Sequence, residues 1–342
     1  MNRTTTSFIA HASPVVPREV VDSIARSRRP VIIAHVVPDA DAMGSMLATA
    51  LAWTGEGRTP RIALPDGSLS QKLGFLRELA KPEVATAADF ASADAFVVLD
   101  TASKDRCNVG AALKETDWSS DRPVVNVDHH ATNTRFGGVN WIVPEASSAC
   151  ELVYEVLRSA ERRITPTIAS LLYAGIQTDT LGFSLASSTP TALRAAADLV
   201  ELGADVADLG ERLGRSQRQS EFDLLRVIYA NTKVVGDGRI AYSSASFDEI
   251  HNAGCTAADI DDQITVPRSL DGVQLAMLFS EGRKGRTRIN FRGSGKVTVV
   301  ELAQEFNGGG HAQAAGAILD CSLEEAIRKL VPRAIEHIKR FS

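Results

Sequence analysis

The chain has 342 residues, of which 44% are hydrophobic and 23% are charged, a composition typical of a folded protein long enough for two domains. The formal net charge of −5 at pH 7 argues against a protein that coats long nucleic acid, so a polyanionic partner should be short. Four widely separated cysteines without a CxxC pair argue against a disulfide framework or zinc knuckle. No apolar run approaches the about 20 residues that a membrane-spanning helix needs. We therefore expect a cytoplasmic protein without membrane contact.

Short β-branched runs alternate with helical patterns in the first half of the chain, which is typical of βαβ units and a parallel sheet. We expect strands at residues 31–34, 61–64, 95–99 and 124–127, and helices at 43–53, 147–157 and 167–177. Residues 190–228 have an entirely helical pattern. Strands return at 232–235, 240–245, 273–279 and 286–292, and helices follow at 297–306 and 323–337.

These patterns predict an α/β fold in three parts. Residues 1–190 should form a domain around a parallel sheet, residues 191–230 a helical connector, and residues 231–342 a smaller α/β domain with a mixed sheet.

Imidazole and carboxylate side chains recur where the predicted elements of the first half end. They are His35, Asp39, Asp41, Asp100, Asp128, His129, His130 and Asp179. In an open parallel sheet, ligands bind beyond the carboxyl ends of the strands, so these residues should form one site. A single Asp at a strand end is usually a cap or turn residue, but four such positions favour a site for divalent cations.

The same residues belong to recognisable motifs. The runs His35-x-x-Pro38-Asp39-x-Asp41-x-x-Gly44-Ser45, Asp100, Asp128-His129-His130-x-x-Asn133 and Thr178-Asp179-Thr180 resemble the four motifs of the DHH phosphoesterase superfamily. In the second half, Asn290-Phe291-Arg292-Gly293 and Phe306-Asn307-Gly308-Gly309-Gly310-His311, followed by Ala314-Ala315-Gly316, resemble the DHH-associated substrate-binding domain. The resemblance points to the nanoRNases, which are short-chain oligoribonucleases that also dephosphorylate 3′-phosphoadenosine 5′-phosphate, and it implies an active site in a cleft between the two domains.

The resemblance implies two Mn²⁺ ions, with Mg²⁺ or Co²⁺ as substitutes. One ion would be held by His35, Asp39 and Asp100, and the other by Asp41, Asp100, His129 and Asp179, so that Asp100 bridges them. Two ions about 3.5–4 Å apart can activate a bridging water and stabilise an in-line displacement at phosphorus.

Three further residues of these motifs have catalytic or binding roles in the family. His130 would contact the scissile phosphate, either as a charged stabiliser or as the acid for the leaving 3′ oxygen, while Asp128 would orient its neighbours. For Asn133 the alternatives of substrate binding and turn capping are equally open.

A phosphate-binding strip is expected on the strand at 286–292. Its period of two places Arg286, Arg288, Asn290 and Arg292 on one face, although a solvated strand face is the alternative. Gly308, Gly309, Gly310 and His311 should form a substrate-binding loop whose backbone amides approach a phosphate or base. Asn307 replaces a glycine that is common in the family, but Asn tolerates positive φ, so we expect the loop to persist. Ala40 likewise replaces a common glycine.

The leading hypothesis is a Mn²⁺-dependent phosphodiesterase and phosphatase that cleaves short oligoribonucleotides to nucleoside monophosphates by two-metal activation of a bridging water. A further candidate substrate is 3′-phosphoadenosine 5′-phosphate, which would be hydrolysed to AMP. The alternative is turnover of cyclic or linear dinucleotide second messengers at the same site. A non-catalytic nucleotide sensor is disfavoured because every family metal ligand is present. We expect short nucleotides as partners, no long nucleic acid, and a homodimer.

Overall fold

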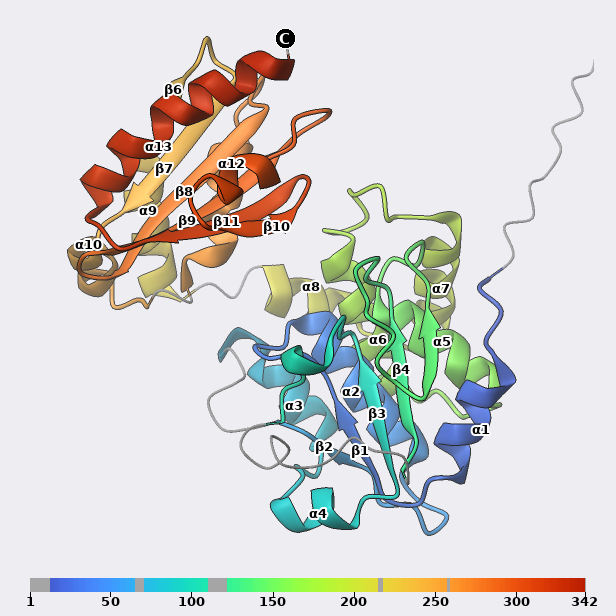
Figure 1. Ribbon diagram of the computed structural model, residues 1–342. Helices are drawn as coiled ribbons and strands as arrows, with labels where there is room; N and C mark the ends of the chain where they lie inside the picture. The colour runs from blue at the N-terminus through green and yellow to red at the C-terminus, as the bar shows by residue number, and fades with distance from the viewer. Residues whose placement is uncertain (1–12, 65–70, 110–121, 215–217, 257–258, 342) are drawn as a thin grey trace, which may run out of the picture. The chain divides into compact units, whose positions relative to one another are not determined.

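The computed structural model of the protein describes residues 13–64, 71–109, 122–214, 218–256 and 259–341. The chain divides into two compact units, Met1–Ser216 and Gln217–Ser342, each built around its own sheet (Figure 1). The predicted α/β class, with a parallel sheet first and a mixed sheet second, is confirmed.

The first unit contains a five-stranded parallel sheet in the order β2-β1-β3-β4-β5. Its strands are β1 (Pro30–Ile33), β2 (Arg61–Ile62), β3 (Ala95–Leu99), β4 (Val124–Asp128) and β5 (Val139–Ile142). The strand order reverses between β1 and β3, and ligands bind at such a switch point, beyond the carboxyl ends of the strands. Strand β5 was not predicted, because it is half-exposed and lacks a continuous β-branched run.

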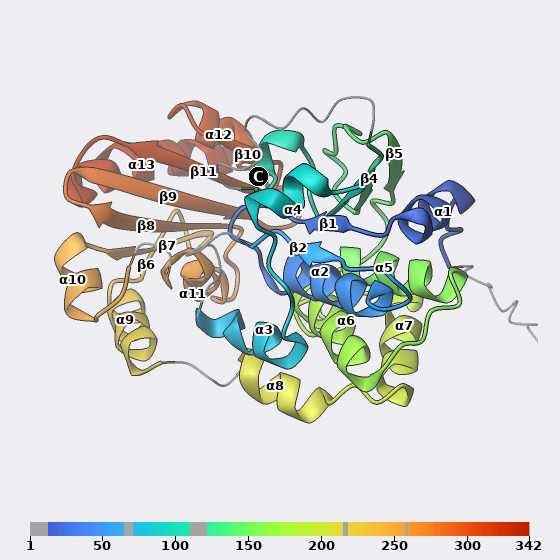
Figure 2. The same cartoon turned by 90° about the horizontal axis from the view of Figure 1, so that it is seen from below.

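Most helices of the first unit cover one face of this sheet, and α4 lies on the other (Figure 2). The larger core contains apolar side chains of α1 (Arg18–Arg26), α2 (Ala40–Trp53), α3 (Gly74–Ala80), α5 (Ala149–Ser159), α6 (Pro166–Asp179), α7 (Pro190–Glu201) and α8 (Val206–Gly214). On the opposite face, Phe90 of α4 (Ala87–Ser92) packs with Ile33, Phe96 and Val98 of the sheet. Helix α2 is hydrophobic on nearly every side because it is buried between the sheet and α6.

The second unit contains a six-stranded sheet in the order β10-β11-β9-β8-β7-β6. Its strands are β6 (Lys233–Val235), β7 (Ile240–Ala245), β8 (Leu275–Arg283), β9 (Arg286–Gly293), β10 (Gly309–His311) and β11 (Ala314–Leu319). Only the β7 and β8 pair is parallel.

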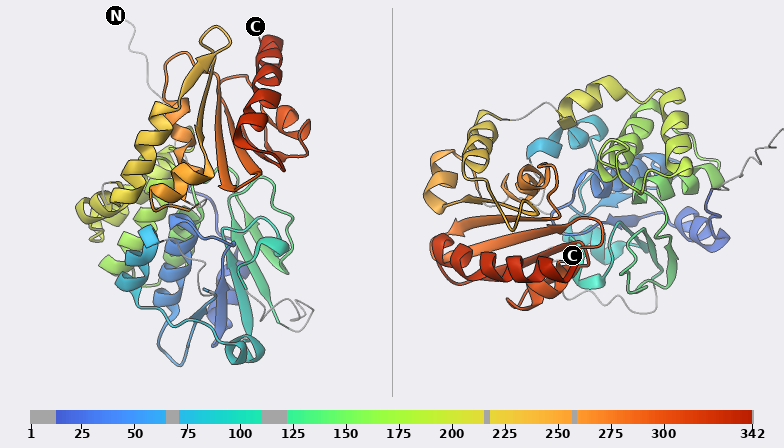
Figure 3. Two further views of the ribbon diagram at one scale, coloured as in Figure 1. Left: turned by 90° about the vertical axis from the view of Figure 1, so that its left-hand side faces the viewer. Right: turned by 90° about the horizontal axis from the view of Figure 1, so that it is seen from above.

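Helices lie on both faces of the second sheet (Figure 3). Helices α12 (Val300–Gln304) and α13 (Leu323–Ile338) pack on one face, and α9 (Gln219–Ala230), α10 (Phe247–Asn252) and α11 (Thr265–Arg268) pack on the other. None of the helices in the described ranges is long and apolar enough to cross a membrane.

The glycine-rich segment corrects one expectation. Gly309–His311 forms the edge strand β10, paired with β11, where a loop was predicted. Glycine carries little strand propensity, so the pairing with β11 decides the conformation. Asn307, just before it, adopts a left-handed backbone conformation with φ of 57°.

Candidate metal centre

The first motif forms the start of helix α2. The sequence pattern predicted a helix from residue 43, but α2 begins at Ala40 because Asp39 is its N-cap. Asp39 Oδ1 accepts hydrogen bonds from the backbone amides of Asp41 and Ala42, both at 3.0 Å. The other oxygen, Oδ2, lies 3.8 Å from His35 Nε2. The cap therefore turns Asp39 and Asp41 toward the carboxyl end of β1.

His35 presents its Nε2 atom to the carboxylates. Its Nδ1 donates to the backbone carbonyl of Val36 at 2.9 Å, which leaves Nε2 as the metal-ligating atom, 3.3 Å from Asp100 Oδ2. Burial alone would lower the pKa of His35, but hydrogen bonds to Asp100 and Asp39 outweigh it and raise the pKa to about 10. In the absence of a cation, the carboxylates hold a proton on this ring.

Asp41 lies at the amino terminus of helix α5. Its Oδ2 accepts from the backbone amide of Ala149 at 2.7 Å and its Oδ1 from that of Cys150 at 2.8 Å. The helix dipole favours a carboxylate there. The side chain is nevertheless fully buried, and burial together with the nearby Asp100 carboxylate raises its pKa to about 7.

Asp179, the last residue of α6, completes this side of the cluster. Its Oδ2 lies 3.4 Å from His129 Nε2, which is also 3.9 Å from Asp41 Oδ2. Burial and the neighbouring carboxylates, Asp41 first, raise the pKa of Asp179 to about 9. Burial alone would lower the pKa of His129, but its hydrogen bond to Asp100 and the surrounding carboxylates raise it to about 10.

Asp100 connects the two sides of the cluster. Its Oδ2 faces His35, and its Oδ1 lies 3.4 Å from His129 Nε2. The residue is 2% exposed and has a left-handed φ of 50° at the end of β3. Its Oδ1 is buried and contacts His129 Nε2 at 3.4 Å and His130 Nδ1 at 3.6 Å, but within the described ranges neither contact has the geometry of a good hydrogen bond. A buried carboxylate oxygen in this state is costly unless it binds a cation.

The geometry fits divalent cations. One group of potential ligands contains His35, Asp39 and Asp100, and another contains Asp41, His129 and Asp179, with the atoms of each group within 4.8 Å of one another. The first group is the set expected for one ion, whereas the second lacks Asp100, which the expected set for the other ion includes. A third group contains Asp100, Asp128, His129 and His130. Four clustered carboxylates also repel one another, and a cation would relieve that repulsion.

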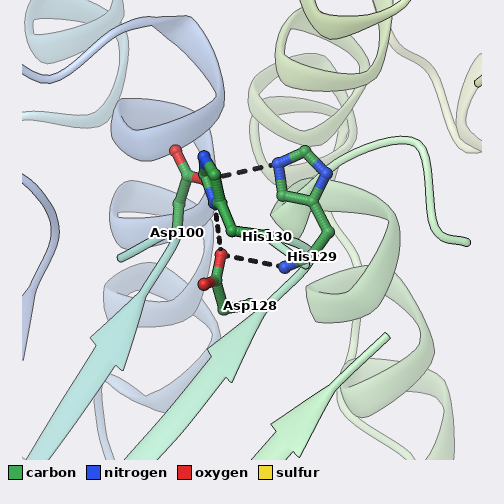
Figure 4. A group of neighbouring side chains, drawn as sticks. All are labelled: Asp100, Asp128, His129 and His130. Carbon is green, nitrogen blue, oxygen red and sulfur yellow. Dashed lines mark hydrogen bonds and ion pairs between the residues drawn. The ribbon is translucent and has the colours of Figure 1, made fainter. Parts of the chain in front are cut away.

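The Asp-His-His motif holds His130 beside the cluster (Figure 4). His130 Nδ1 is 2.7 Å from Asp128 Oδ1, which also accepts from the His129 backbone amide at 2.8 Å. The hydrogen bond to Asp128 raises the pKa of His130 above its ordinary value. Since Nδ1 is engaged and the side chain is one-third exposed, Nε2 is the atom that can reach a substrate.

Asn133 supports this motif from behind. Its Nδ2 donates to Asp128 Oδ2 at 2.6 Å, and its Oδ1 accepts from the Arg135 backbone amide at 2.6 Å. The second bond closes an Asx turn, so the structure favours turn capping over substrate binding for Asn133.

Close packing behind Asp41 was not predicted. A Cβ atom on Gly175 would overlap Cys150 Sγ and lie 2.7 Å from Asp41 Oδ1, and one on Gly44 would overlap the backbone oxygen of Leu171. Cys150 is a buried free thiol. The available signal was the presence of small residues, Gly44, Cys150 and Gly175, at helical positions beside the motifs.

The candidate substrate residues of the second unit lie on β9 and the β10–β11 hairpin. Strand β9 follows the predicted alternation over residues 286–289, with Thr287, Ile289 and Phe291 fully buried and Arg288 exposed, but Asn290, expected on the polar face, is buried. Arg288 Nε donates to Asn290 Oδ1 at 3.2 Å, and Arg292 is half-buried. The register places Arg292, Ala314 and His311 in one row across three strands, although the His311 side chain is outside the described part of the structure.

Two of the glycines there have packing reasons. A Cβ on Gly308 would lie 2.8 Å from the Cβ of Ala317 and 2.9 Å from the Ala303 oxygen. Gly310 has a φ of 142°, and a Cβ there would lie 2.6 Å from the Cα of Ala315. At Gly309 there is open space. Packing therefore requires glycine at 308 and 310, and only Gly309 has room beside it.

Comparison with known proteins agrees with these observations. Residues 29–176 match the DHH family N-terminal domain, and residues 237–340 match the DHHA1 domain. The chain is similar to the bifunctional oligoribonuclease and PAP phosphatase of Thermus thermophilus, with 29% identity over 94% of both chains. It is also similar to a cyclic-di-AMP phosphodiesterase of Listeria monocytogenes, with 25% identity over 93% of this chain and 49% of that protein.

A solved structure shows the same fold. An exopolyphosphatase-related protein from Bacteroides fragilis has a TM-score of 0.86 and 24% identity, covering 96% of this chain and 99% of that one.

Proposed function

The chain belongs to the DHH family of phosphoesterases and is a metal-dependent hydrolase, and we propose that it cleaves short oligoribonucleotides to nucleoside monophosphates. We include 3′-phosphoadenosine 5′-phosphate, hydrolysed to AMP, as a second substrate. The observation that carries the proposal is the pair of ligand groups joined by Asp100. Similarity to the Thermus thermophilus enzyme along nearly the whole chain supports the substrate class.

The metal requirement follows from the donor set. We propose two Mn²⁺ ions, one held by His35, Asp39 and Asp100 and the other by Asp41, Asp100, His129 and Asp179, with Mg²⁺ or Co²⁺ as substitutes. Imidazole combined with carboxylate ligands favours Mn²⁺ modestly over Mg²⁺. Bound divalent cations supply Lewis acidity, which lowers the pKa of water and neutralises charge at phosphorus.

His130 is the proposed catalytic acid or charged stabiliser. Asp128 holds its Nδ1 and raises its pKa, so a larger fraction of the ring is protonated near neutral pH. A protonated Nε2 can donate a hydrogen bond to the scissile phosphate or a proton to the leaving 3′ oxygen. Asp128 thus acts through His130.

The second unit is proposed to bind the substrate's phosphate. Arg288 and Arg292 lie on the polar face of β9, and guanidinium groups can bond two phosphate oxygens at once. We assign the same role to the backbone of the adjacent row, Gly308, Gly309, Gly310 and His311. A cleft between the domains and a homodimer stay predictions.

A second candidate function is the turnover of cyclic or linear dinucleotide messengers by the same residues. Similarity to the Listeria monocytogenes phosphodiesterase supports it, although the chain spans about half of that protein. A non-catalytic sensor is disfavoured, because all six proposed ligands are present.

A turnover panel tests these proposals. It compares diribonucleotides to pentaribonucleotides, 3′-phosphoadenosine 5′-phosphate, cyclic di-adenylate and a long single strand, each with Mn²⁺ and with a chelator. Preference for the short linear substrates would support the first function, and faster turnover of the cyclic one would favour the second. Binding without turnover of any substrate would revive the sensor hypothesis.

A further inference from the structure

Asn126 is a fully buried polar residue in the middle of the sheet, two residues before Asp128 on β4. Since side chains of a strand alternate, Asn126 and Asp128 share a face. Its Nδ2 donates to the backbone oxygens of Val98 and Thr101, both at 3.3 Å. These two carbonyls flank Asp100, so one amide group holds both sides of the left-handed turn that presents this carboxylate.

The other end of the Asn126 amide reaches the His130 support. Asn126 Oδ1 lies 2.9 Å from Asn133 Nδ2, whose two hydrogens are shared among Asn126 Oδ1, Asp128 Oδ2 and, at 3.1 Å, the Thr101 oxygen. Asp128 in turn holds His130. A continuous hydrogen-bonded path therefore runs from the turn at Asp100, through Asn126 and Asn133, to Asp128 and His130.

We propose that Asn126 is a positioning residue that sets Asp100 and His130 relative to each other. This inference rests on the proposed function, in which Asp100 holds metal and His130 contacts substrate. Asn126 touches neither substrate nor metal and acts only through Asp100's turn and Asn133. Side chains that orient metal ligands from behind typically affect activity or metal affinity by about 10-fold to 100-fold when replaced.

The chemistry of the position calls for an amide. The side chain must donate to two carbonyl oxygens and accept from one N–H, and only Asn and the longer Gln combine an NH₂ with an oxygen. In Asn126→Asp the oxygen that faces Asn133 is retained, but a carboxylate oxygen replaces the NH₂ and would face the two carbonyls. In Asn126→Ala both ends of the path are lost.

Asn140 provides a matched control. It lies opposite Asn126 in the register of the adjacent strand β5, and its side chain also makes two backbone hydrogen bonds, both to Gly137. Neither bond involves a member of the candidate metal centre. Asn140→Ala should therefore lower stability without changing catalysis.

The test measures kcat and KM on a diribonucleotide, Mn²⁺ affinity by calorimetry, and thermal melting for each variant. We expect Asn126→Ala and Asn126→Asp to lower kcat by about 10-fold to 100-fold and weaken Mn²⁺ binding, with KM within about twofold. The proposal would be overturned if the Asn126 variants kept near-normal kcat and Mn²⁺ affinity. It would also be overturned if their losses were no larger than those of Asn140→Ala at the same drop in melting temperature.

A double-variant cycle tests the path itself. Because Asn126 acts partly through Asn133, the kcat loss of Asn126→Ala combined with Asn133→Ala should be smaller than the product of the single losses. A fully multiplicative loss would overturn the path. If Asn126→Ala does not fold, Asn126→Ser, which keeps a donor and acceptor, takes its place in the cycle.

Failure of the positioning role of Asn126 can be distinguished from failure of the proposed function. Wild-type protein that turned over no nucleotide would refute that function. The Mn²⁺ affinities of the Asn126 and Asn140 variants would still decide whether Asn126 positions the metal ligands.

Discussion

Replacing Gly175 with alanine should disturb the metal centre from behind. The added Cβ would overlap Cys150 Sγ and lie 2.7 Å from Asp41 Oδ1. Neither neighbour can move easily, because both are fully buried and Asp41 is held by the amides of Ala149 and Cys150. The overlap can therefore be relieved only at a cost in stability, by displacing Asp41 from its position at the start of α5.

Two opposing effects set the expected change in the unfolding free energy of Gly175→Ala. Overpacking a well-packed core costs about 1–3 kcal/mol. Alanine in place of glycine within a helix returns about 1 kcal/mol. The net loss of unfolding free energy should therefore reach about 2 kcal/mol. If displacement of Asp41 costs about 1.4 kcal/mol of Mn²⁺ binding free energy, the Mn²⁺ affinity falls about tenfold.

Gly210→Ala is the matched control. Gly210 also lies in a helix, but a Cβ there meets no atom within 4 Å. That variant should be stabilised by about 0.4–1 kcal/mol, with unchanged Mn²⁺ affinity.

Chemical denaturation and calorimetric Mn²⁺ titration measure the two effects. Combining Gly175→Ala with Cys150→Ala removes the overlap with Sγ but leaves the contacts with Asp41 Oδ1 and, at 2.9 Å, with the Cβ of residue 150, so the double variant should regain part of the stability without regaining affinity. The reasoning is refuted if Gly175→Ala matches Gly210→Ala in both measurements, or if the double variant recovers both properties.

Three other predictions follow from the site. Asp100→Ala should abolish Mn²⁺-dependent hydrolysis because it removes the residue shared by the two proposed ligand sets, whereas the exposed control Asp105→Ala should retain it. Near-normal turnover in Asp100→Ala would reject the bridging role. The raised pKa values of His35 and His129, about 10, and of Asp179, about 9, mean that the folded metal-free protein keeps protons that the unfolded chain has lost. The melting temperature of the metal-free protein should accordingly fall as the pH rises from about 6.5 to about 9. The increase in melting temperature on adding Mn²⁺ should grow over the same range, because metal binding displaces these protons. A melting temperature that does not change with pH would contradict this reasoning. Arg292→Ala should raise KM about tenfold for substrates with a terminal phosphate and leave kcat near normal, whereas the exposed control Lys284→Ala should leave KM unchanged. The same KM in Arg292→Ala and Lys284→Ala would argue against the phosphate-binding strip.

Much of the architecture follows from local patterns in the sequence. Strands β3 and β7 have the predicted bounds, and β3 is a short apolar run that is entirely buried. The predicted alternation of β9 is confirmed for residues 286–289 but not at Asn290, which is buried. The clustering of His35, Asp100 and His129 could be anticipated because parallel strands direct their carboxyl ends to one edge of the sheet.

The tertiary structure decided the features that depend on distant partners. Asp41 lies at the start of α5 through hydrogen bonds to backbone amides 108 and 109 residues away. The support given by Asn126 and the need for Gly175 likewise arise only when separate elements pack together. The periodicity of apolar residues indicates which side of a helix or strand is buried. Hydrogen bonds and close contacts between elements depend on how those elements are arranged in space, which a local sequence pattern does not predict.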